Sequence, residues 1–216
     1  MASYVVVDLE MCTVPKRARE SGFKYGSELI QIGAVMLDEE FVIRDSFMTY
    51  VAPEYGTING FIRRLTGITR RHTEGAPSTR EALERFADWL PDDARLVAWS
   101  GNDRAQIEHE ILGKHLSIPR LDGYMSDDRW VDCQVEFARK MDTSYSFRLS
   151  EALLLADVEY DDGAHDALVD ARNTARIFAK VRGTCDFAPS PYLVRSDRVT
   201  DYTFNPFRKV ACARVY

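Results

Sequence analysis

Residues 3–10 read SYVVVDLE, and this stretch decides most of what the sequence says about the fold. Its run of valines belongs in a core, so we expect a strand that is buried on both faces. Acids enter only at its end, as Asp8 and Glu10. Because strand side chains alternate, both carboxylates point to one face of the sheet while Leu9 points to the other. The stretch predicts a core strand that ends in a pair of acids.

The segments after this strand alternate between strand and helix patterns. A polar loop with Pro15, Gly22 and Gly26 comes first, and two β-branched and aromatic runs, 29–37 and 41–51, then predict a hairpin. Beyond the hairpin we expect a short helix at 58–65, which Gly67 ends, and a helix that starts at a Ser78/Glu81 capping box and runs to Leu90. A strand at 95–99 and a helix at 103–115 follow. After an extended piece at 130–133, we expect helices at 134–140, 149–156 and 166–181. This order predicts an α/β domain built on a mixed β-sheet flanked by helices.

The length of 216 residues suits one domain with or without an appendage. We expect the domain to cover 1–182. From Gly183 the pattern loses its period and becomes rich in proline, so 183–216 is interpreted as a C-terminal extension that packs on the domain or on a partner, a second copy of the chain included.

The composition is that of a soluble globular protein, with 45% hydrophobic and 29% charged residues. The apolar runs are far shorter than the ~20 residues of a membrane helix, and the strand pattern at Tyr4 leaves no room for a secretory signal. The four cysteines form no CxxC pair and are interpreted as reduced thiols (Cys12, Cys133, Cys185 and Cys212). These features predict a cytoplasmic protein with no membrane partner.

The net charge of −6 argues against a nucleic-acid partner, since such domains are usually basic. Two bound divalent cations would bring this total to about −2 and would themselves face a phosphate. Arg63, Arg64, Arg70 and Arg71 also lie within ten residues of one another, although such a run is commonly a solvated surface. Net charge therefore decides little.

Two further candidate acids and a histidine follow the first pair: Asp103, Asp170 and His165. Asp-x-Glu offers the oxygen ligands that Mg²⁺ prefers, although one such triplet is expected by chance in an acidic chain. Asp103 follows a strand end, where α/β sheets place their sites, but with Gln106 it also resembles a helix cap. His165 and Asp170 converge only if His165 lies in a loop and the helix starts near Asp166; otherwise they are a surface pair.

Three motifs, in order, now resemble the DEDDh 3′–5′ exonuclease superfamily, whose fold is RNase H-like. They are VVVDLEMC, AWSGNDRAQIEHE and HDALVDARNTARIF. The segments ELIQIGAVMLD, FMTYVAPEY and FIRRLTGIT are similar to the branch of histone-mRNA and small-RNA exonucleases. The second motif lacks the Asn-x-x-Phe-Asp form of polymerase proofreading subunits, and Gln31 stands where relatives often carry Glu, which we do not expect to touch catalysis. The likeness covers roughly 3–182.

The resemblance implies a role for each site residue. It implies that four acids hold two Mg²⁺ or Mn²⁺ ions, that His165 is the general base, and that Met11, Leu65 and Ile68 hold the terminal base; the four acids are Asp8, Glu10, Asp103 and Asp170. Asp8, Glu10 and Asp170 would hold one ion, while Asp8 would bridge to a second that Asp103 supports. Core packing is the alternative for the apolar residues, and for Phe61 we prefer it.

The function that follows is metal-dependent 3′–5′ exonuclease activity on single-stranded nucleic acid, with release of nucleoside 5′-monophosphates. RNA is favoured over DNA on family likeness alone, because contacts to a 2′-hydroxyl are not visible in spacing. The alternatives are a DNA-directed proofreading-type exonuclease, an endonuclease of the same fold, and a non-catalytic nucleic-acid-binding module.

Overall fold

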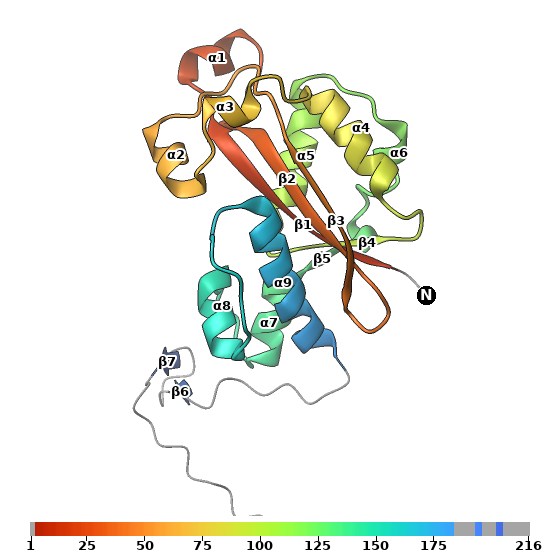
Figure 1. Cartoon of the computed structure of the whole chain (residues 1–216), viewed down its shortest axis with the longest axis vertical. Coiled ribbons are helices and arrows are strands. Elements are labelled where there is room, and N and C mark those ends of the chain that lie inside the picture. Colours follow the sequence, from red (N-terminus) through yellow and green to blue (C-terminus); the bar gives the residue numbers. More distant parts are fainter. Residues whose placement is uncertain (1–2, 184–192, 196–201, 205–216) are drawn as a thin grey trace, which may run out of the picture.

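A computed structural model of the chain describes residues 3–183, 193–195 and 202–204 (Figure 1). Its main body is a five-stranded sheet in the order β3-β2-β1-β4-β5. The strands are β1 (Tyr4–Thr13), β2 (Ser27–Leu37), β3 (Ile43–Tyr50), β4 (Arg95–Ala98) and β5 (Trp130–Asp132). The first three pair antiparallel, while β4 and β5 run parallel to β1. The predicted mixed sheet is confirmed.

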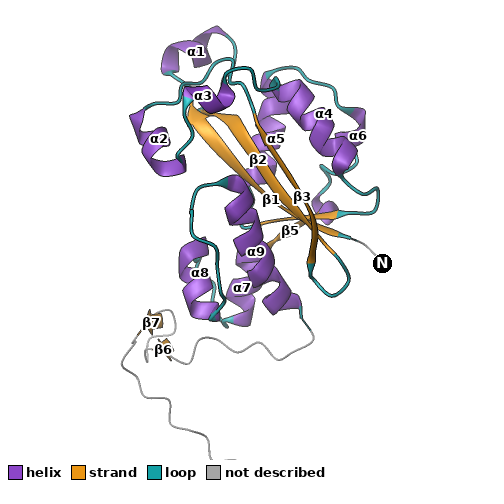
Figure 2. Ribbon diagram, in the orientation of Figure 1, coloured by secondary structure: helices purple, strands orange, loops and turns teal. Residues whose placement is uncertain are grey.

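Helices cover both faces of this sheet (Figure 2). The α-helices of the described residues are α1 (Lys16–Ser21), α2 (Gly60–Thr66), α3 (Arg70–Thr73), α4 (Thr79–Trp89), α5 (Asn102–Gly113), α6 (Pro119–Asp122), α7 (Cys133–Lys140), α8 (Leu149–Ala156) and α9 (Ala167–Arg182), of which α1–α3 lie at one end of the sheet. One core lies between the sheet and α7–α9 and includes Val6 and Phe178. A second core lies between the sheet and α4–α6 and includes Val5, Val7 and Leu9.

The alternation of side chains along β1 determines which face of the sheet the acids lie on. Val6 packs in the core beneath α7–α9, whereas Val5 and Val7 pack in the opposite core. Asp8 and Glu10 share the parity of Val6, so they lie on the α9 face of the sheet. The register of β1 against β2 shifts only after Glu10, so both acids precede this irregularity.

Most predicted helices are present within a few residues of their expected ends. Ser78 and Glu81 form the predicted capping box at the start of α4. Gly67 ends α2 at φ 71°, a left-handed conformation that glycine adopts without a steric cost. Asp166 caps α9 by accepting the backbone N–H groups of Leu168 and Val169. These ends were readable because each depends on residues within one turn.

Several parts of the chain differ from expectation, and the short helices α3 and α6 are among the elements that were not predicted. The predicted polar loop at 14–26 contains α1, a helix without an apolar period for a sequence pattern to reveal. In the C-terminal extension, β6 (Leu193–Arg195) and β7 (Tyr202–Phe204) pair as a two-stranded antiparallel sheet that was not predicted. The prediction of what 183–216 packs on falls largely outside the described residues.

The structure also bears on the membrane and thiol predictions. None of the helices in the described part of the chain combines the length and apolarity that a bilayer crossing requires. Cys12 and Cys133 are buried free thiols, as expected. Cys185 and Cys212 lie outside the described residues.

Candidate active site

The middle of β1 supplies two carboxylates to the site, whereas the sequence predicted that the strand would end at them. Asp8 is half-buried and Glu10 is 8% exposed, and both face α9. β1 continues to Thr13, well past the last residue that pairs with β4, since that pairing ends at Val6 opposite Val97. Beyond this point no strand among the described residues pairs with this edge of β1, and its backbone groups need other partners.

Asp103 supplies one of these partners. Its Oδ1 accepts a hydrogen bond of 3.0 Å from the backbone N–H of Leu9, between Asp8 and Glu10. The N-cap of α5 is Gly101, and Gln106 instead bonds Ser27 and Glu110. The alternative interpretation of Asp103 as a helix cap is therefore wrong. Its side chain is 7% exposed and joins the start of α5 to the acid pair on β1.

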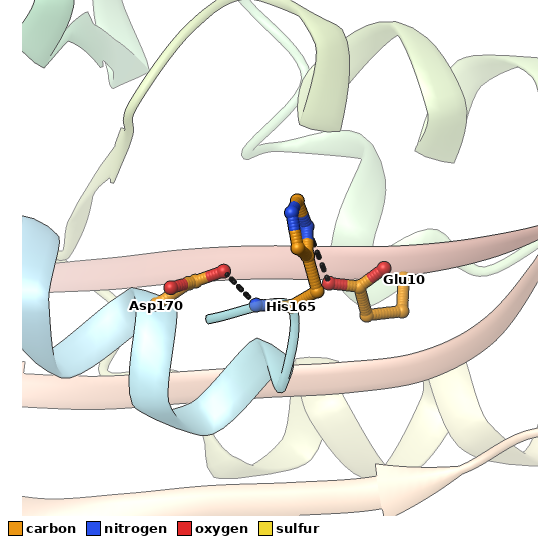
Figure 3. A group of neighbouring side chains, drawn as sticks. All are labelled: Glu10, His165 and Asp170. Carbon is orange, nitrogen blue, oxygen red and sulfur yellow. Dashed lines mark hydrogen bonds and ion pairs between the residues drawn. The ribbon is translucent and has the colours of Figure 1, made fainter. Parts of the chain in front are cut away.

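The first turn of α9 brings the remaining pair. His165 lies in the loop before Asp166, at φ 68°, and its backbone N–H donates a 2.8 Å hydrogen bond to Oδ2 of Asp170. This arrangement is the one that allows the two side chains to converge. The imidazole Nδ1 lies 4.0 Å from Oε1 of Glu10, and one ligand atom each of Glu10, His165 and Asp170 lie within 4.8 Å of one another (Figure 3).

Two residues of β2 set the position of α9 and were missed as site residues. Gly33, opposite Asp8 in the register, lies against α9 so closely that an added Cβ would be 2.2 Å from the backbone of Ala167. Buried Gln31 accepts the N–H of Ala167 at 3.1 Å and lies 3.4 Å from Asp166. A lone glycine in a buried strand is a signal of close backbone approach that could have revealed this contact.

The five predicted polar residues line one cavity of about 460 Å³, here called the acid-lined cavity. Asp8, Glu10, Asp103 and Asp170, the acid cluster, share it with His165. They come from β1, α5, α9 and the loop before α9, segments that are distant in sequence. The structure therefore brings the predicted set together where β4 ends beside the middle of β1.

Burial and mutual repulsion raise the pKa values of the acid cluster. Burial raises the pKa of Glu10 to about 8, and the charges of Asp170 and Asp103 add to it. Burial also raises the pKa of Asp103 to about 7, although the N–H of Leu9 opposes the shift. The pKa values of Asp8 and Asp170 are raised, first by burial. Each carboxylate is thus costly to ionise unless a cation is present.

The apolar wall of the cavity differs in part from expectation. Met11 and Leu65 line it as predicted, and Leu65 is 37% exposed. Ile68 is 2% exposed and packs with Ile62 in a separate buried cluster. Ile62 also lines the acid-lined cavity, whereas Ile68 does not. The prediction that Ile68 walls the pocket directly is thus corrected. The prediction that Phe61 packs in the core is also wrong, because its side chain is 60% exposed.

Comparison with known proteins places this site in a family. The family model RNase_T, described as "Exonuclease", matches residues 5–178. The chain belongs to this exonuclease family. The match spans the five predicted polar residues of the acid-lined cavity and stops before the C-terminal extension.

Relatives and solved structures agree with this assignment. "ERI1 exoribonuclease 2" of Danio rerio is 29% identical over 69% of the chain, which spans only 30% of that protein's length. "DNA polymerase III subunit epsilon" of Aquifex aeolicus is 30% identical over 83% of the chain and 80% of its own length. The solved structure "3'-end specific recognition of histone mRNA stem-loop by 3'-exonuclease" superposes with a TM-score of 0.71 over 90% of this chain and 68% of that one, at 19% identity. The predicted exonuclease family is confirmed by the family model, and the predicted RNase H-like fold is confirmed by the superposition.

The exonuclease site is suited to hard divalent cations. Its donors are carboxylate oxygens, the ligands that Mg²⁺ and Mn²⁺ prefer. Of the described residues that line the acid-lined cavity, none is lysine or arginine. Burial and the charges of the neighbouring acids raise the pKa values of Asp8 and Glu10, which disfavours their charged forms unless a cation lies among them. The residues present therefore fit a metal centre that draws its positive charge from solution.

Proposed function

We propose that the chain is a metal-dependent 3′–5′ exonuclease that removes nucleotides singly from single-stranded RNA and releases nucleoside 5′-monophosphates. The single observation that carries this proposal is the convergence of four acids and His165 around one cavity that has an apolar wall at its side. An apolar wall holds a base without reading its sequence, while the acids face its phosphate through cations.

The acid cluster would hold two Mg²⁺ or Mn²⁺ ions. Asp8, Glu10 and Asp170 would hold one, and Asp8 with Asp103 the other. When bound, such ions lower the pKa of water and supply positive charge opposite a phosphate. The N–H of Leu9 and the N–H of His165 orient Asp103 and Asp170 for this task, since each donates to a carboxylate oxygen.

His165 would accept the proton of the attacking water. An imidazole has an ordinary pKa of about 6.5 and can take a proton near neutral pH. Its side chain is 49% exposed, which leaves a route for the proton to reach solvent. Its proximity to Glu10 and Asp170 also allows it to be a metal ligand, and the two roles differ in what its removal does to metal affinity.

Met11, Leu65 and Ile62 would contact the terminal base, with Ile68 supporting Ile62 from behind. RNA is preferred because a relative is named an exoribonuclease and a similar structure is titled for histone mRNA. A DNA-directed proofreading exonuclease is the second candidate, favoured by the similarity to a DNA polymerase III subunit.

Matched RNA and DNA strands, labelled at either end, test the proposal. With Mg²⁺ or Mn²⁺, a 3′ label should leave at once as a mononucleotide, whereas a 5′ label should give a ladder that shortens stepwise. EDTA should stop both reactions. The variant Asp8→Asn, purified identically, controls for contaminating nucleases.

Each competing function predicts a different product. Internal fragments from both labels would indicate an endonuclease, and faster loss of DNA than of RNA would favour the proofreading type. Strand binding without any product would indicate a non-catalytic module. A 5′ label released first as a mononucleotide would contradict the proposed polarity.

A further inference from the structure

A second cavity of about 510 Å³, the α8–α9 cavity, adjoins the acid-lined cavity. It is lined by residues of 148–154 and 160–165 and by Asp170 and Asn173. Leu149, His165 and Asp170 line both cavities, so the two hollows meet at the candidate base and the last acid. A strand lying in one of them can continue into the other without leaving the surface.

The order of the two cavities follows from the proposed function, on which this inference rests. If the terminal base lies against Leu65 on α2, the phosphate to be cleaved lies at the acids. The preceding nucleotide must then leave on the other side of the acids. Figure 1 shows α2 above and α8 below the loop that leads into α9. Ile62 and Leu65 of α2 line the acid-lined cavity, whereas the α8–α9 cavity is lined from α8 and by no residue of α2, so it lies on the side away from α2.

The wall of the α8–α9 cavity suits a base better than a phosphate. Leu153 is buried at its floor, while Leu154 and Tyr160 remain 48% and 46% exposed. Asp162 adds an unfavourable charge for an anion, so the phosphate must keep to the rim, where exposed Arg148 lies. Aromatic and aliphatic surfaces of this kind stack on any base, because every base has a π-face.

This wall is held in place by the helix that carries Asp170. The side chain of Asn173, 2% exposed, accepts the N–H of Asp161 at 2.9 Å and donates to its carbonyl oxygen at 3.0 Å. Arg176 bonds the carboxylate of Asp161 at 3.0 Å. Tyr160 therefore extends from a segment anchored to α9, one turn from the acid cluster, and needs little ordering when a ligand binds.

We propose that the α8–α9 cavity binds the base of the penultimate nucleotide. Tyr160 and Leu154 stack on this base, and Arg148 contacts the phosphate on its 5′ side. The site is indifferent to base identity but requires that a base be present. It thereby makes the rate of release depend on at least two nucleotides at the 3′ end.

Two substrates that differ only upstream of the scissile bond test this. The p-nitrophenyl ester of a nucleoside 5′-monophosphate fills the terminal site but has no penultimate nucleotide, whereas a single-stranded oligonucleotide has both. For Tyr160→Ala, the ratio of kcat/KM for oligonucleotide over ester should fall about 5- to 150-fold, the range for one lost stacking contact. Tyr160→Phe, which keeps the ring, should keep the wild-type ratio. Tyr145→Ala, at a tyrosine 48% exposed outside both cavities, is the matched control.

An oligonucleotide with an abasic residue at the penultimate position removes the same contact from the substrate side. Wild type should release the first nucleotide from this strand as slowly as Tyr160→Ala does from the normal strand, and the variant should lose nothing more. Equal losses on ester and oligonucleotide, or a wild type indifferent to the abasic site, would overturn the inference. If wild type cleaves neither substrate, the proposed function itself fails, which is a distinguishable result.

Discussion

Two groups of buried acids lie close together in this fold, and they are neutralised in opposite ways. Glu28 and Glu110 are fully buried, and the buried Nζ of Lys114 lies 2.6 Å and 3.0 Å from their oxygens. The acid cluster has no such cation among the described residues that line its cavity. A buried lysine thus lies beside the two glutamates, whereas no lysine lines the cavity of the four clustered acids. The difference indicates that the first group serves the fold and the second serves ions from solution.

The lysine-paired group also shows what an internally neutralised site does. Glu28 accepts the N–H groups of Glu54, at 2.7 Å, and Tyr55, at 2.8 Å, and so holds the loop that precedes α2. Glu110 accepts the N–H of Leu29 at 2.7 Å. The carboxylates of this group therefore accept hydrogen bonds that hold the backbone in place, whereas the acid cluster lines a cavity.

Removing one acid from the cluster should have the largest effect. Asp8→Asn should abolish nucleotide release, because the ligand common to both proposed ions is lost. In EDTA the same variant should be more thermally stable than wild type, since repulsion within the cluster falls. Activity assays and thermal melts check the two outcomes. A destabilised variant would contradict the view that these acids repel one another in the absence of metal.

His165→Ala should lower the rate of release by about 10²–10⁴-fold, as expected for the loss of a general base. Its affinity for Mn²⁺, measured by calorimetry, should stay near that of wild type. A large loss of metal affinity would instead make His165 a ligand, and the cluster would then not rely on carboxylates alone.

Lys114→Met should destabilise the fold by about 3–5 kcal/mol, because Glu28 and Glu110 would be left buried without a cation. Denaturant unfolding measures this loss. Lys16→Met is the control, since Lys16 pairs with Glu20 on an exposed helix and should be silent. If Lys114→Met were as stable as wild type, the contrast between the two groups would not hold.

Stability in EDTA should also depend on pH. The pKa of Glu10 is about 8 in the fold against 4.5 in the unfolded chain, so the folded state binds more protons between these values. Stability should therefore be highest near pH 4–5 and decline as pH rises toward 8. Mg²⁺ should raise the melting temperature more at pH 8 than at pH 6. Glu10→Gln should flatten the decline; an unchanged slope would assign it to other groups.

The parts of the site that the sequence predicted depend on local patterns. The valine run and its period place Asp8 and Glu10 on one face, and the Asp166 cap places His165 in a loop. Each follows from neighbours within a few residues. The family resemblance then supplied Asp103, whose local pattern pointed to a helix cap.

The parts that the sequence missed depend on contacts between distant segments. Asp103 bonds Leu9, 94 residues away in the chain, and Gln31 bonds Ala167, 136 residues away. Spacing along a chain carries no information on such pairs. The exposure of Phe61 and the burial of Ile68 likewise follow from how α2 lies on β1, which the helix pattern alone does not determine.

Calorimetric titration of Mn²⁺ into the full chain at pH 7.5, in buffers of different ionisation enthalpy, tests the central claim most directly. The account predicts two ions per chain with net release of protons, because carboxyl groups with raised pKa values must ionise to bind metal. It also predicts that Asp8→Asn loses this binding. A folded wild-type protein that binds no divalent ion, or binds it without proton release, would contradict the claim that the acid cluster is a metal centre.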